Sequence, residues 1–122
     1  MKVKFTIGEV ECIAELDEKL ETVLEIKKAL PIKSYANRWG DEVYFETSLD
    51  FEKEENSKDV VEIGDVAFWI PGKAICIFFG KTPISDEKIR PASAVNVIGR
   101  VVSGLENLKK VKDGDQVFLN LL

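Results

Sequence analysis

The most constraining feature of this chain is an unbroken run of apolar residues at positions 74–79, AICIFF. Because the run has no polar face, it predicts a β-strand that is buried on both sides. It closes the stretch 60–79, in which VVEI and VAFW, joined by Gly64-Asp65, read as a central pair of strands. The core of the protein is therefore expected around this stretch.

The composition predicts one packed domain over residues 1–122, since 45% of the residues are apolar. A net charge of −5 argues against nucleic acid or an anionic membrane as a partner, because both need a basic face. No stretch approaches the ~20 apolar residues of a membrane span, and the N-terminus lacks a signal-peptide core. We expect a cytoplasmic protein. Its Lys-Glu bias, with Gln116 as the single glutamine, fits a thermophilic source.

Several kinds of reactive site are excluded or disfavoured by the residues present. The chain has no histidine, which removes Cys-His and Ser-His-Asp pairs and histidine zinc sites. Cys12 and Cys76 lie in apolar, strand-like segments and are expected to be reduced core residues, although their spacing leaves one disulfide open. The acidic segment 50–59 lacks the spacing of a calcium loop, and Gly72-Lys73 lacks the frame of a phosphate loop. We expect no metal and no cofactor.

The first half of the chain reads as two hairpins around one helix. Alternating apolar residues predict strands over 2–7 and 10–16. A helix should begin between Asp17 and Thr22, where TVLE fits a capping box, and Pro31 should end it. The second hairpin joins a strand over 32–39 to one over 42–47.

The rest of the chain adds loops, strands and a short helix. The segment 48–59 reads as a solvated loop with Phe51 as its anchor, and 80–94 as a long ordered loop. Strands follow over 96–102 and 116–121, with a short helix over 105–111 between them. About eight short strands in one small domain predict a closed barrel, because closure removes exposed edges.

Three sequence motifs resemble small, single-domain, cyclophilin-like proteins of bacteria and archaea. They are NxWGxExYF from Asn37, IGDVxxWxPGKAxCxFFGKTP over 63–83 and PASAVNVIG over 91–99. The C-terminal third, with its strand, short helix and closing strand, also resembles the end of true cyclophilins. The resemblance covers nearly the whole chain. It implies a mainly β, closed eight-stranded cyclophilin-like barrel with one early and one short late helix, but no agreed activity.

The resemblance to true cyclophilins covers little of their prolyl isomerase chemistry. Phe79 falls on the phenylalanine of the proline pocket, and Arg38 lies on the strand that corresponds to the one with the catalytic arginine. The glutamine spacing after that arginine is absent, as are the histidine and the tryptophan of the following loop, and Trp69 lies near the position of a peptide-binding asparagine. Most of the catalytic set is missing, and a shared fold does not fix a function.

Aromatic residues with polar tips gather on neighbouring predicted strands, namely Tyr35, Trp39, Tyr44 and Trp69. They either fill the barrel or line a ligand pocket at one opening of it. Glu42 and Glu46 also share a strand face, which is more typical of solvated acids than of a hydrolase pair. The predicted ligand-binding residues are Asn37, Arg38, Trp39, Glu42, Tyr44, Trp69, Phe79, Thr82 and Asn96, with Arg38 catalytic only in an isomerase.

Three functions remain open from the sequence. The first is a non-catalytic module that binds a peptide or a small-molecule ligand. The second is a divergent peptidyl-prolyl isomerase that uses Arg38 and Phe79. The third is a subunit of an assembly, which would show a large apolar surface patch.

Overall fold

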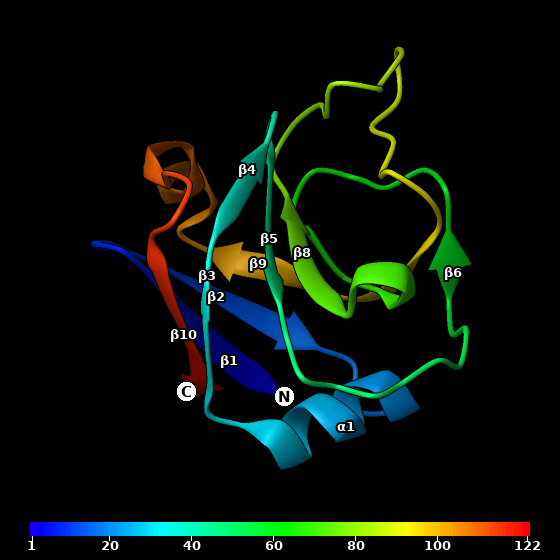
Figure 1. Cartoon of the computed structure of the whole chain (residues 1–122), viewed down its shortest axis with the longest axis vertical. Coiled ribbons are helices and arrows are strands. Elements are labelled where there is room, and N and C mark those ends of the chain that lie inside the picture. Colours follow the sequence, from blue (N-terminus) through cyan, green and yellow to red (C-terminus); the bar gives the residue numbers. More distant parts are fainter.

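A computed structural model describes residues 1–122 as a mainly β, nearly closed barrel with one α-helix and two short 3-10 helices (Figure 1). The elements in chain order are β1 Lys2–Ile7, β2 Val10–Leu16, α1 Glu21–Ala29, β3 Ile32–Tyr35, β4 Asn37–Trp39, β5 Glu42–Glu46, β6 Ser57–Lys58, β7 Asp65–Trp69, η1 Ile70–Gly72, β8 Ala74–Phe78, β9 Val95–Ser103, η2 Leu105–Lys110 and β10 Gln116–Leu121. Both η segments are 3-10 helices. No helix is long and apolar enough to cross a membrane.

The barrel is nearly closed because one stretch of chain supplies both edge strands of the sheet. The strand order is β3-β10-β1-β2-β9-β7-β8-β5-β4, and every pair is antiparallel. β3 and β4 are consecutive halves of the predicted strand 32–39, separated only by Ala36. Counted as one, they reduce nine strands on this path to the predicted eight, so the barrel prediction is confirmed.

Two apolar clusters lie on opposite faces of the strands. The interior cluster of 23 residues fills the barrel, and Val23 and Ile26 of α1 and Leu108 of η2 contribute to it. The outer cluster lies on the other face of β7, β8 and β9 and contains Val61, Ala67, Cys76, Phe78 and Val95. All five residues of β8 are buried. The expectation of a strand buried on both sides is therefore confirmed.

Several sequence predictions need correction. The segment VVEI is not a strand: Val61 makes one isolated bridge to Ile89, so the central pair is β7 and β8. The predicted strand 32–39 breaks at Ala36, whose backbone bonds to Gly114 and Asp115 instead of continuing one ladder. The short strand β6 was not predicted, because its pairing with β9 is long-range. The late helix is a 3-10 segment.

The acidic loop 48–59 is attached to α1 and to the barrel. Thr22 does not form the predicted capping box. Instead, the Glu55 carboxylate accepts hydrogen bonds from the backbone N–H of Glu21 (3.0 Å) and from the N–H and hydroxyl of Thr22 (2.7 Å each). Phe51 anchors the loop edge-to-face against Phe68, with ring centroids 6.4 Å apart. The loop therefore supplies the cap that the helix lacks.

Both cysteines are buried and free, as predicted, so no disulfide joins the two clusters. Cys12 faces the interior cluster and Cys76 the outer cluster. The strand register therefore places the two thiols on different faces of the sheet.

Candidate functional site

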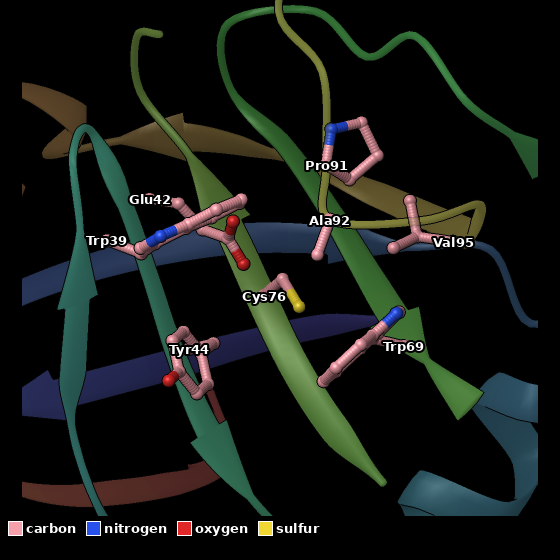
Figure 2. A pocket seen from close by; sticks show the side chains of 8 residues that line it. All are labelled: Trp39, Glu42, Tyr44, Trp69, Cys76, Pro91, Ala92 and Val95. Carbon is pink, nitrogen blue, oxygen red and sulfur yellow. The ribbon is translucent and has the colours of Figure 1, made fainter. Parts of the chain in front are cut away.

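A cavity of about 130 Å³ opens on the outer face of the barrel, beside the outer cluster (Figure 2). We call it the outer pocket. It is lined by Trp39, Glu42, Tyr44, Trp69, Cys76, Pro91, Ala92 and Val95. Six of these eight residues are hydrophobic, so the pocket suits a small, mainly apolar group.

The register of the strands brings these side chains together. Trp39 on β4 lies opposite Glu42 on β5, and Tyr44, two residues further on, lies opposite Cys76 on β8. Alternate residues of a strand point to the same face, so Glu42 and Tyr44 share one wall. Figure 2 shows Trp39 and Tyr44 across the pocket from Trp69, with the Glu42 carboxylate and the Cys76 thiol between them.

Glu42 is the unusual member of the pocket. Glu42 is only 5% exposed, and its Oε1 has no hydrogen-bond partner. Burial raises the pKa of Glu42 to about 7, an effect that the neighbouring Cys76 thiol partly opposes. An unpaired buried carboxylate costs folding free energy, because the charge loses its water without gaining a partner.

Trp69 is held in place by two contacts. Its indole Nε1 donates a 2.7 Å hydrogen bond to the Ser93 hydroxyl in the 80–94 loop. Its ring also lies against Gly72, where an added Cβ would come within 2.5 Å of the ring carbons. The single polar group of Trp69 is thus already used, which leaves its apolar surface to the pocket.

Comparison with known proteins identifies the family. The cyclophilin-like family model matches residues 1–120. The chain belongs to the cyclophilin-like family. It is also similar to a solved structure, the solution structure of the hypothetical protein AF2241 from Archaeoglobus fulgidus, with 64% identity, a TM-score of 0.88 and coverage of 100% of this chain and 95% of that chain. No curated protein matches it.

The outer pocket of this cyclophilin-like barrel unites four of the nine predicted ligand-binding residues. Trp39, Glu42, Tyr44 and Trp69 all line it. Of the aromatic residues considered with them, Tyr35 lies apart and is 62% exposed. These rings lie on the outer face of the strands, so they neither fill the barrel nor line an opening of it, the two arrangements that the sequence left open.

Arg38 and Phe79 lie away from the outer pocket. Phe79 belongs to the interior cluster, and the Arg38 guanidinium carbon lies 5.0 Å from the centroid of its ring. The guanidinium also donates hydrogen bonds to the carbonyls of Gly40, Lys109 and Val111. These contacts tie the β4–β5 hairpin to the end of η2, so Arg38 serves the structure here.

The remaining predicted residues also hold chain segments together. Asn96 is 1% exposed, accepts a hydrogen bond from the Glu55 N–H and donates to the Lys53 carbonyl and the Thr22 hydroxyl. Thr82 bonds to Ser85 and to the Arg90 carbonyl within the 80–94 loop. Asn37 makes one long contact, 3.5 Å, to the Tyr44 carbonyl.

Four lining residues were missed by the sequence analysis, namely Cys76, Pro91, Ala92 and Val95. The sequence does contain a signal for Cys76. It lies two residues before Phe78 in a strand, so the two share the face opposite to Ile75 and Ile77. The positions of Pro91 and Ala92 follow from how a long loop folds back over the sheet. No local pattern encodes that path.

The outer pocket presents no activated nucleophile. Burial, together with the nearby Glu42 carboxylate, raises the pKa of Cys76 well above its ordinary value, so the thiol stays protonated. No group of three or more acidic or cysteine side chains is arranged to hold a metal ion. The pocket offers aromatic faces, an apolar rim and one carboxyl group.

Proposed function

We propose that this cyclophilin-like barrel is a binding module, which holds a small, mainly apolar group of a peptide or a small molecule in the outer pocket. The observation that carries the proposal is the unpartnered Oε1 of Glu42, 5% exposed, in a concave aromatic pocket. A polar group buried without a partner lowers stability, and such groups are uncommon without a functional reason.

The size and shape of the outer pocket support a small ligand group. A cavity of about 150 Å³ holds a benzene ring, so about 130 Å³ accommodates a group of similar bulk. Trp69 is positioned by Ser93, which favours a pocket formed before the ligand arrives. Preformed pockets bind with a smaller loss of conformational entropy.

Prolyl isomerisation is the alternative function. It would require a hydrogen-bond donor at the prolyl nitrogen, and the arginine predicted for that role donates to three backbone carbonyls instead. The outer pocket itself is lined by no arginine, lysine or histidine. These contacts favour binding without catalysis.

A blocking variant tests the binding function. Ala92 is exposed, and in Figure 2 its methyl group points into the pocket, so Ala92→Trp should fill the cavity without disturbing the core. Small amines, amides and prolyl peptides would be titrated while the indole N–H signals of Trp39 and Trp69 are followed by NMR. At least one of these ligands should shift both signals saturably in the wild type and in Ala94→Trp, but not in Ala92→Trp. The proposal fails if none of them shifts either signal.

A further inference from the structure

The outer pocket contains one acidic group and no basic group to pair with it. The other titratable residues that line it are Tyr44 on β5 and Cys76 on β8, whereas β4, β7 and the 80–94 loop present non-titratable side chains. The arginines on the neighbouring elements are engaged elsewhere. Arg38 pairs with Asp41 at 3.5 Å, and Arg90 pairs with Asp86 at 3.0 Å. No lysine or arginine of the protein forms an ion pair with Glu42.

Three aromatic side chains surround the position that a counter-ion would take. Trp39 and Tyr44 lie on one side of the Glu42 carboxylate and Trp69 on the other (Figure 2). The faces of aromatic rings carry negative electrostatic potential and attract cations, and tryptophan is the strongest of them. Within this protein Arg38 already lies over the Phe79 ring in this way.

The rest of the lining suits an alkylated cation better than a hydrated metal ion. Pro91, Ala92 and Val95 complete an apolar rim, and the Trp69 N–H is occupied by Ser93. A metal ion would need several oxygen ligands, whereas the pocket supplies a single carboxylate. An alkylammonium group instead gains from both the carboxylate and the apolar walls. The net charge of −5 also favours the approach of a cation.

We infer that the outer pocket is a receptor for a small alkylated ammonium group, with Glu42 as its counter-ion and Trp39, Tyr44 and Trp69 as its aromatic walls. This inference rests on the proposed binding function and names the chemical class of the ligand. The cavity of about 130 Å³ takes a group of about the bulk of a tetramethylammonium ion. The ion would replace the water that Glu42 loses on folding with a charge partner.

The pH dependence of binding separates a cation from a neutral ligand. A cation needs the carboxylate, so protons compete with it around the Glu42 pKa of about 7. Affinity should therefore fall about tenfold between pH 8 and pH 6. A neutral amide would accept a hydrogen bond from the protonated carboxyl group, so its affinity should rise as the pH falls.

The experiment uses tetramethylammonium chloride, with tert-butanol as a neutral probe of similar shape and sodium chloride as the ionic-strength control. N,N-dimethylacetamide and a capped prolyl peptide serve as neutral amide probes. Indole N–H shifts and intrinsic fluorescence report the Kd in the intact chain at pH 6 and pH 8. We expect saturable binding of tetramethylammonium that weakens about tenfold at pH 6 and at least about tenfold in Glu42→Gln. Glu46→Gln, which removes an exposed charge from the same strand, should leave the Kd unchanged.

Other outcomes overturn the inference in distinguishable ways. If tert-butanol binds as tightly as tetramethylammonium, the pocket does not recognise charge. The same follows if Glu42→Gln binds tetramethylammonium with the Kd of the wild type. If only N,N-dimethylacetamide or a prolyl peptide binds, and more tightly at pH 6, the binding function stands but the ligand is neutral. If no probe shifts either indole signal, both the inference and the proposed function fail. Because Gln keeps the shape of Glu, a thermal unfolding curve suffices to show that the variant is folded.

Discussion

Arg38 and Glu42 lie four residues apart on one hairpin, and both place a charged group beside aromatic rings. Arg38 projects towards Phe79 and the end of η2, where its guanidinium donates to the carbonyls of Gly40, Lys109 and Val111. Glu42 projects to the outer face, where its Oε1 has no partner. The arginine fulfils its hydrogen-bonding capacity within the fold, whereas the glutamate does not.

This difference separates a structural charge from a candidate binding group. A buried charge with fixed partners holds segments in register, and its removal leaves those partners unpaired. A buried charge without partners lowers stability unless something outside the chain compensates it. Arg38 is expected to behave as a structural charge and Glu42 as a binding group, and their substitutions should separate the two.

The largest expected effect is a pH-dependent stability that Glu42 causes. Its pKa rises from an ordinary 4.5 to about 7 on folding, so the folded state holds the proton more tightly. The contribution of Glu42 to the free energy of unfolding is therefore most favourable below pH 4.5, and about 3 kcal/mol of it is lost as the pH rises to 7. Urea unfolding at pH 4.5 and at pH 8 measures this loss. Glu42→Gln should remove this loss, and Glu46→Gln should retain it. Equal pH dependence in all three proteins would contradict the assignment.

Arg38→Ala should lower the free energy of unfolding by about 2 kcal/mol, because charge-assisted hydrogen bonds to three carbonyls are lost, and the one to Val111 is part-buried. Denaturant unfolding at pH 7 gives the value. The matched control is Arg90→Ala, which removes an exposed ion pair to Asp86 and should cost less than about 1 kcal/mol. Binding in the outer pocket should not change. A loss of binding without a loss of stability would place Arg38 with the ligand instead.

Glu55 offers a smaller contrast with Glu42, since it is a carboxylate whose partners lie within the fold. Although burial opposes it, hydrogen bonds from Thr22 and Glu21 lower the pKa of Glu55. Its stabilising effect is therefore present near neutral pH and is lost as the pH falls through the folded-state pKa. Glu55→Gln should cost about 1 kcal/mol at pH 7, the usual value of a helix cap. The difference from the wild type should shrink at pH 3, and a constant difference would argue against a capping charge.

The smallest expected effect is on prolyl isomerisation. We expect no acceleration of cis–trans exchange of an X–Pro peptide, measured by NMR exchange spectroscopy at high protein concentration. The reason is that the arginine predicted to assist this reaction is bonded to the backbone. If the protein accelerates the exchange and Arg38→Ala abolishes the acceleration, then Arg38 is not a purely structural charge.

Local patterns in the sequence specified most of the strands of this barrel. Alternation identified β1 and β2, the apolar run identified β8, and the final strand was predicted over its observed range, because one or two buried faces leave a period in the sequence. The segment VVEI shows the limit of such patterns. Val61 packs into the outer cluster from a loop while Ile63 is exposed, and a short apolar loop has the same composition as a strand.

The candidate site was predicted in part for the same reason. Trp39, Glu42, Tyr44 and Trp69 carry polar tips on strands, and that combination stands out in a sequence. Which face each residue joins depends on register and closure, and these are set by pairings between distant segments. The sequence therefore determined which chemical groups this protein has. Only the tertiary structure decided that the partners of Arg38 lie inside the fold, while Glu42 faces an aromatic pocket with none.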